Sequence, residues 1–215
     1  MSVAGNPAPW DDLFEQDLIP AVLALVEAAW NKFEKPGQDA HEDDISKRLY
    51  VALVNGKDRN THAFLIRYQD VDVDADLSRE TGRKDIVFFP SLFDEPIYFC
   101  LEAKRLNALI SGQRKSLADE YVKEGMQRFV DRKYSRHVRH GGMLGYVLDG
   151  DMDRAIANVS NCIRLHQAAL RMEVPAELLK SRIRPADPHT RETRHRRPNE
   201  AAVFCLHHLF VAGAG

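Results

Sequence analysis

Two carboxylates and a lysine fall on neighbouring apolar segments in the middle of the chain. Asp85 opens the run DIVFF at 85–89, and Glu102 and Lys104 close the run IYFCLEAK at 97–104. Because side chains alternate along a strand, Glu102 and Lys104 share one face of the second run. Two carboxylates from adjacent strands can hold Mg²⁺, and a lysine beside them can orient water or stabilise charge on a phosphorane. The pattern therefore predicts metal-dependent chemistry on a phosphate ester.

Two helices are expected ahead of these strands, because apolar residues recur there at helical spacing. The first covers Asp12 to Lys32, and the second ends at Asn55-Gly56. Glu42 precedes Ile45 by three residues and Leu49 by seven, so on the second helix it shares their inward-facing side. Glu42 is therefore expected to join the acidic pair.

The rest of the chain alternates between strand patterns, helical patterns and breaks. The expected elements are a strand at 63–68, a solvated acidic loop at 70–76, a helix at 116–134, a turn at Gly141-Gly142, a strand at 143–148, a helix from Asp151 or Asp153 to about Leu170, an irregular basic stretch at 175–198 and a strand at 202–211. The order αα-βββ-α-β-α-β predicts an α/β fold, a mixed sheet flanked by helices.

At this point the residues resemble the PD-(D/E)xK nuclease superfamily. Asp85 followed by Glu102-Ala103-Lys104 at a strand end carries the resemblance, which covers roughly 42–149. It implies a restriction-endonuclease-like mixed β-sheet core flanked by helices, with αβββαβ order. It also implies that Asp85, Glu102 and the Ala103 carbonyl ligate Mg²⁺, for which Mn²⁺ can substitute. Lys104 would position or activate water, and Glu42 would support the metal. The sequence departs from the family at Lys84, where proline is usual.

The acidic-x-lysine spacing occurs a second time, at Asp131-Arg132-Lys133. That copy falls in a helical pattern with no strand before it, so the strand context favours Glu102 and Lys104. The family often places a glutamine or tyrosine on the helix after the lysine strand. Gln127 or Tyr121 matches that position, and Gln113 is a third candidate.

The resemblance implies a Mg²⁺-dependent nuclease that hydrolyses phosphodiester bonds, with DNA as the expected substrate and an endonuclease as the expected type. Restriction, anti-phage defence and mobile-element roles all use this fold, and a homodimer or a partner protein of such a system would be compatible with it. The alternative is a catalytically silent restriction-endonuclease-like domain that binds nucleic acid or a protein partner, in which the acidic and basic residues merely pair.

Length and composition predict a single domain covering 1–215, and the resemblance implies that it is nuclease-like. Within it we expect an N-terminal helical extension at 1–40, a catalytic core at 41–150, and a C-terminal helix, basic loop and strand at 151–215. The 215 residues are 44% apolar and 29% charged, which is typical of globular chains. No export signal or membrane-spanning segment is evident, so a cytoplasmic location and no membrane partner are expected.

The formal net charge of -2 gives no global attraction to a polyanion. The arginine-rich segment 191–197 is the expected phosphate contact, since arginine forks match phosphate oxygens; the candidates are Arg194, Arg196 and Arg197. A second basic stretch at 128–139 has the same character. The alternative for both is an ordinary solvated surface.

The three cysteines are widely spaced in apolar runs, so neither a disulfide framework nor a zinc site is predicted, and reduced, mostly buried thiols are expected. The histidines also favour no metal site. His207 and His208 should point to opposite sides of a strand, so at most one of them could be a ligand. The remaining candidates lack metal-ligand spacing on one element; they are His137, His140, His189 and His195.

Overall fold

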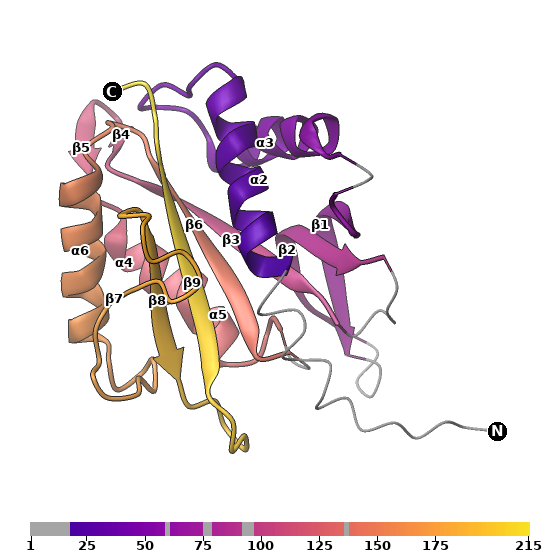
Figure 1. Ribbon diagram of the computed structural model, residues 1–215. Coiled ribbons are helices and arrows are strands. Elements are labelled where there is room, and N and C mark those ends of the chain that lie inside the picture. The colour runs from indigo at the N-terminus through magenta and orange to yellow at the C-terminus, as the bar shows by residue number, and fades with distance from the viewer. Residues whose placement is uncertain (1–17, 59–60, 75–78, 92–96, 136–137) are drawn as a thin grey trace.

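The computed structural model describes residues 18–58, 61–74, 79–91, 97–135 and 138–215. Its centre is a seven-stranded sheet in the order β1-β2-β3-β6-β9-β8-β7 (Figure 1). The strands are β1 Phe64–Asp74, β2 Arg79–Pro90, β3 Phe99–Leu106, β6 His140–Val147, β7 Leu179–Lys180, β8 Thr190–His195 and β9 Phe204–Ala212. A separate small hairpin pairs β4, Ala108–Ile110, with β5, Gln113–Lys115.

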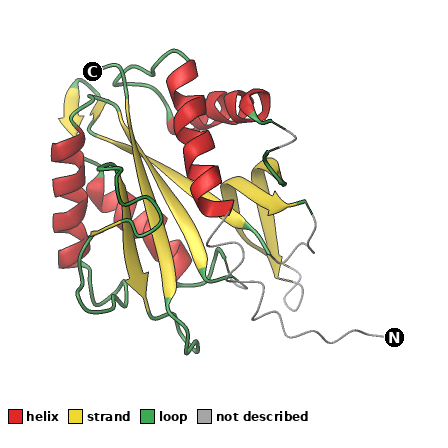
Figure 2. Ribbon diagram, viewed as in Figure 1, coloured by secondary structure: helices red, strands yellow, loops and turns green. Residues whose placement is uncertain are grey.

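Helices lie on both sides of the sheet (Figure 2). They are α2 Ile19–Lys32, α3 Glu42–Gly56, α4 Ala118–Glu120, the π-helix η2 Tyr121–Met126, α5 Gln127–Val130 and α6 Met152–Leu165. The strands β1, β2 and β3 are antiparallel, β3, β6 and β9 are parallel, and β8 and β7 return antiparallel. The α/β class with a mixed sheet flanked by helices is therefore confirmed.

The central strand β6 separates two hydrophobic cores, because alternate side chains point to opposite faces. Leu144 and Tyr146 pack with α2 and α3 on one face, and Trp30 stacks on Tyr146 at 5.2 Å between ring centroids. Met143 and Val147 pack on the other face with η2, α5 and α6. Every residue of β6 is buried, so the strand is held from both sides.

Gly141 and Gly142 lie inside β6, so the predicted turn at this point is wrong. A Cβ added to Gly142 would lie 2.3 Å from a methyl group of Leu101, and one on Gly141 would lie 2.6 Å from the ring of Phe129. Neither approach is sterically allowed. The two glycines therefore serve close packing of β6 against its neighbours, which the sequence pattern alone did not distinguish from a turn.

The acidic run predicted as a loop is largely strand. β1 continues through Asp74 and pairs with the early part of β2, which begins at Arg79 rather than at Asp85. Backbone pairing with β2 therefore makes this acidic run a strand although its composition is that of a loop. Asp70 forms an ion pair with buried Lys84 at 3.1 Å. Asp76 lies outside the described residues.

The basic stretch at 175–198 was predicted to be irregular, but β7 and β8 form within it. Arg182 and Arg194 both pair with buried Glu192 of β8, at 2.8 and 3.1 Å. These ion pairs allow charged residues to enter the sheet, and they hide the strand from a hydrophobicity pattern.

Other boundaries shift by a few residues. The first predicted helix is described from Ile19, with Pro20 in its first turn, and its residues 12–17 lie outside the described range. Of the two predicted starts of α6, Asp151 is the residue that caps the helix, because its carboxylate accepts from the Arg154 amide at 3.1 Å. The cysteines all lie within the described ranges; all three are buried and no disulfide joins any two of them. No helix in those ranges is long and apolar enough to cross a membrane.

Candidate metal-dependent active site

The sheet forks where the candidate residues lie. β2 and β3 pair only from Ile86 to Phe88 on one side and from Phe99 to Leu101 on the other. Beyond that point β2 pairs with β1 alone. The Ala103 amide therefore has no backbone carbonyl of β2 as its partner. The carboxylate of Asp85 takes that place, with Oδ2 accepting from the Ala103 N–H at 2.8 Å. Asp85 is therefore held where β2 and β3 diverge, by a hydrogen bond that takes the place of a backbone hydrogen bond between the strands.

Glu42, the first residue of α3, satisfies the next exposed amide on β3. Its Oε2 accepts from the Arg105 N–H at 3.0 Å, and its Oε1 accepts from Lys104 Nζ at 2.8 Å. The Arg105 guanidinium donates to the Ala40 carbonyl at 3.0 Å, which ties the start of α3 to the same strand. The structure thus brings the predicted helical glutamate to the strand pair, through contacts with both a side chain and the backbone.

Lys104 lies at the centre of the cluster and is mostly buried. Its ammonium is 2.8 Å from Glu42 Oε1, 2.9 Å from the Ala103 carbonyl oxygen and 3.1 Å from Glu102 Oε1. Burial lowers the pKa of Lys104, but Glu102 and Glu42 outweigh burial and the net shift is upward. The lysine is therefore a fixed cation in this arrangement.

Arg128 of α5 is a member of the cluster that the sequence did not reveal. Its Nη1 donates to Glu102 Oε1 at 2.7 Å and to the hydroxyl of Tyr134 at 2.9 Å. Tyr134 in turn donates to the carbonyl oxygen of Arg83 on β2 at 2.6 Å. The available signals were the position of Arg128 on the helix after the lysine strand and its place in the basic stretch 128–139.

Glu102 is the most buried acid of the cluster, with 1% exposure. Its Oε1 accepts from both Lys104 and Arg128, whereas its Oε2 is buried without a hydrogen-bond partner among the residues that the structure describes. A buried carboxylate oxygen without a donor costs free energy. The unpartnered oxygen fits a cation ligand, because Mg²⁺ takes oxygen ligands from carboxylates and carbonyls.

Both carboxylates of the pair hold protons more tightly than usual. Burial raises the pKa of Asp85 to about 6, against the lowering effect of the Ala103 amide. Burial and then the nearby charge of Asp85 raise the pKa of Glu102 to about 8. Burial and mutual repulsion disfavour the state in which both acids are ionised. A bound dication would offset both effects. The donor set of Asp85, Glu102 and the Ala103 carbonyl therefore fits Mg²⁺.

These raised pKa values give an expected pH dependence of stability for the metal-free protein. Between the unfolded and folded pKa of an acid, the native state binds more protons, so the free energy of unfolding falls as pH rises. Compared with the wild type, Asp85→Asn should lose the fall between about pH 4 and 6, on the order of 3 kcal/mol. Glu102→Gln should lose the fall that continues to about pH 8.

Chemical denaturation with EDTA at several pH values measures this difference. Asp131→Asn is the control, because Asp131 is exposed and accepts only from Gln127 in the contacts shown for its side chain. Parallel pH profiles for the wild type and both site variants would contradict the expected coupling.

The three candidates for an additional polar group on the following helix do not reach Glu102. Gln127 Nε2 donates to Asp131 Oδ1 at 3.0 Å and to the Ala169 carbonyl at 3.3 Å. Tyr121 is fully buried, and its hydroxyl lies 2.9 Å from Nδ1 of His208. Gln113 lies in the separate hairpin, on β5.

The predicted phosphate contacts do not form a mobile basic loop. Arg194 lies in β8 and pairs with Glu192. Arg197 is buried; it donates to the carbonyls of Ser135 and Val138 at 2.7 and 2.9 Å, so its contacts are structural. Arg196 is the exposed member of the three, and its guanidinium pairs with Glu173 at 2.6 Å.

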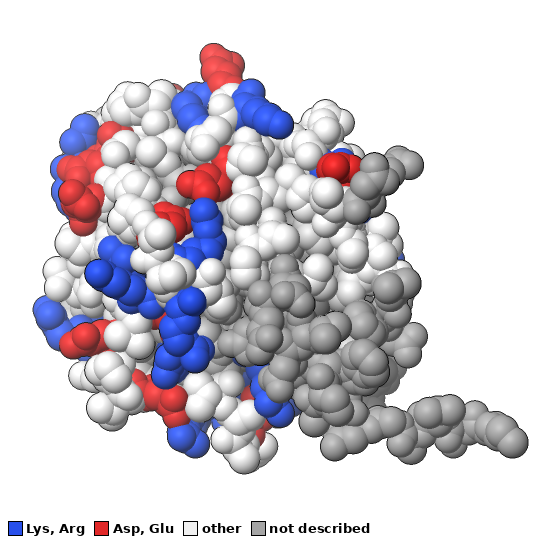
Figure 3. All heavy atoms as spheres, in the orientation of Figure 1, with Lys and Arg blue, Asp and Glu red and all other residues white. Residues whose placement is uncertain are grey.

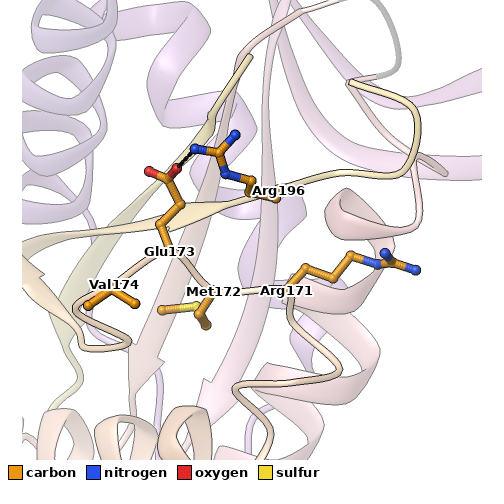
Figure 4. A pocket seen from close by; sticks show the side chains of 5 residues that line it. All are labelled: Arg171, Met172, Glu173, Val174 and Arg196. Carbon is orange, nitrogen blue, oxygen red and sulfur yellow. Dashed lines mark ion pairs between the residues drawn. The ribbon is translucent and has the colours of Figure 1, made fainter. Parts of the chain in front are cut away.

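Figure 4 shows the ion pair of Arg196 and Glu173 at a surface hollow of about 590 Å³, which is also lined by Arg171, Met172 and Val174. None of the five acidic and basic residues at the fork lines this hollow. Basic side chains do gather in a band on the face that carries β7, β8 and β9, with acidic side chains among them (Figure 3). The charge pattern on this face is therefore mixed.

Comparisons of the chain with protein-family models, with curated proteins and with solved structures found no significant match.

Proposed function

We propose that the chain is a Mg²⁺-dependent nuclease that hydrolyses phosphodiester bonds, with DNA as its substrate, on a restriction-endonuclease-like fold. The observation that carries the proposal is the forked site: where β2 and β3 diverge, Asp85 of β2 accepts from the Ala103 amide, and Glu102 of β3 lies 3.1 Å from the Lys104 ammonium. The buried, unpartnered Oε2 of Glu102 supports a cation at this point. A salt-bridged sheet edge would not require an acid whose second oxygen lacks a donor.

The order of elements also supports the proposal. α3 precedes the antiparallel strands β1, β2 and β3, helical segments follow, and β6 then joins β3 in parallel. Apart from the β4–β5 hairpin after β3, this order matches the αβββαβ order that the resemblance implies, which supports the proposed fold. The candidate acids lie where the second and third strands of that unit diverge, so the fold supplies a reason for their proximity.

Each residue can be given a role from its contacts. Asp85, Glu102 and the Ala103 carbonyl would hold Mg²⁺, which when bound supplies Lewis-acid polarisation of a phosphate oxygen and a lowered pKa for water. Lys104 holds a positive charge beside both acids and can orient the attacking water or stabilise charge that builds on the phosphate. Glu42 fixes the Lys104 ammonium, so it acts as a positioning residue.

Arg128 has a different relation to the site. Its contact with Glu102 occupies Oε1, whereas Oε2 is buried without a hydrogen-bond partner among the described residues. The planar guanidinium, about one-third exposed, can also donate to a phosphate oxygen from the side of α5. We assign it to charge balance at Glu102 and to contact with the substrate phosphate.

A silent binding domain is the second candidate, and one observation favours it. Glu102 Oε1 accepts from both Lys104 and Arg128, so protein cations already offset the charge of this acid. Calorimetric titration with Mg²⁺ and Mn²⁺ distinguishes the two candidates. The nuclease is expected to bind either ion in a manner that requires Asp85 and Glu102, whereas a silent domain shows no such binding.

The experiment that tests the proposed activity is a cleavage assay on supercoiled plasmid, linear duplex and single-stranded DNA. We expect nicked or cut products with Mg²⁺ or Mn²⁺ and none with EDTA. An RNA substrate in parallel tests the choice of DNA. Absence of metal-dependent cleavage on all substrates, together with absence of metal binding, would overturn the proposal.

A further inference from the structure

Three metal-ligating side chains converge in the centre of the sheet, away from the fork. His140 is the first residue of β6, and Cys205 and His207 are alternate residues of β9, so all three lie on one face. In the parallel register His140 is paired with Cys205, and Gly142 is paired with His207. All three side chains are buried, and their potential ligand atoms lie within 4.8 Å of one another.

The spacing agrees with a tetrahedral transition-metal site. Two imidazole nitrogens each about 2.0–2.1 Å from a zinc ion are about 3.3 Å apart at the tetrahedral angle. His140 Nδ1 and His207 Nε2 are 3.2 Å apart. The same distance permits a hydrogen bond between the rings without a metal. The cysteine is the additional element, because a thiolate with two imidazoles is a donor set for zinc rather than for Mg²⁺.

A pocket of about 440 Å³ reaches this cluster and leaves room for a fourth ligand from solvent. Its lining residues are Arg139, His140, Arg182, Arg194, Ala201, Ala202, Val203 and Cys205. Three protein ligands and one position open to water describe the coordination of many zinc sites.

The charges around the pocket bear on whether a cation can enter it. Arg182 and Arg194 line the pocket, and both pair with the buried carboxylate of Glu192, at 2.8 and 3.1 Å. This carboxylate therefore offsets part of the positive charge that the two arginines place beside the proposed ligands.

We propose that His140, Cys205 and His207 form a second metal site, which takes a borderline-soft transition ion such as Zn²⁺ and is separate from the Mg²⁺ site at the fork. The ligands come from two strands, so no spacing within one element could reveal them. A metal held there links β6 to β9 in the middle of the sheet, and metal binding in the folded state stabilises the fold.

Titration of the chelator-treated full chain with Co²⁺ tests the proposal. A thiolate ligand gives a near-ultraviolet charge-transfer band, and tetrahedral coordination gives strong visible bands. We expect both to saturate at one equivalent and to disappear when Zn²⁺ is added. Excess Mg²⁺ should leave them unchanged, because Mg²⁺ does not take thiolate ligands.

Cysteine variants locate the site. Cys205→Ala should lose the charge-transfer band, whereas Cys100→Ala, at another buried strand cysteine, should keep it. Cys162→Ala should also keep it. Cys162 approaches Asp119 and His166 in a more exposed group, so loss of the band in that variant would place the metal elsewhere and overturn the proposal.

A thermal readout covers the case in which the core cysteine variant folds poorly. Zn²⁺ should raise the melting temperature of the wild type by several degrees and that of His140→Ala by little or nothing. Asp85→Asn should keep the full shift, so failure at one site is distinguishable from failure at the other. No charge-transfer band in the wild type, or a band and thermal shift that survive in both Cys205→Ala and His140→Ala, would overturn the proposal.

Discussion

Asp85→Asn is expected to abolish Mg²⁺-dependent cleavage, with a rate at least about 1,000-fold below that of the wild type, while the protein stays folded. The substitution removes the negative charge that would hold the ion. It keeps an oxygen that can accept from the Ala103 amide, so the fork retains its backbone hydrogen bond. Initial rates on plasmid and metal affinity by calorimetry should fall together.

Stability should not fall with activity. Burial raises the pKa of Asp85, and a neutral amide removes that desolvation cost as well as the repulsion from Glu102. At pH 8 in EDTA, the free energy of unfolding of Asp85→Asn should equal or exceed that of the wild type. The matched control is Asp131→Asn, from the second acidic-x-lysine copy, which should cleave normally. Retained Mg²⁺-dependent nicking in Asp85→Asn would exclude the proposed site.

Lys104→Met should separate catalysis from metal binding. The methionine fills a similar volume without the charge, so cleavage should fall about 100- to 1,000-fold, the range for removal of a positioned electrostatic group. Mg²⁺ affinity should be kept or increased, because the ammonium no longer competes for Glu102 and the Ala103 carbonyl. A variant at a metal ligand, such as Asp85→Asn, cannot give this combination.

In Lys104→Met, Mg²⁺ should partly replace the missing lysine charge. Without metal, Glu42, Glu102 and Asp85 lose their shared lysine, and the melting temperature should fall because a buried ion pair has lost one partner. Added Mg²⁺ should restore part of the loss, so the thermal shift caused by Mg²⁺ should exceed that of the wild type. Lys133→Met is the control, at an exposed lysine. Equal loss of metal binding and cleavage in Lys104→Met would contradict the assigned role.

The local patterns sufficed for the strand pair and for the helix that delivers Glu42. Periodicity identified the helical side of Glu42, and alternation identified the shared face of Glu102 and Lys104. These properties depend on short-range backbone geometry, which a sequence displays directly. The ends of the strands were predicted less accurately than their existence, because β1 and β2 extend well beyond their apolar segments.

Features that depend on pairing between distant segments could not be obtained in the same way. The charged strand β8 exists because Glu192 meets Arg182 and Arg194, and its composition resembles that of a loop. Arg128 reaches Glu102 only because η2, the helical segment directly before α5, packs on β3. In each case an ion pair that forms only through tertiary packing stabilises an arrangement that the local residues alone would not favour.

Because β2 and β3 diverge, two backbone amides of β3 donate their hydrogen bonds to carboxylates rather than to a neighbouring strand. The Ala103 N–H depends on Asp85, and the Arg105 N–H depends on Glu42. An ion that binds at this site and polarises or moves these carboxylates must change the hydrogen bonds of both amides. Their nuclear magnetic resonance shifts and hydrogen-exchange rates would therefore serve as built-in reporters of occupancy, readable in the intact protein without a substrate or an attached probe.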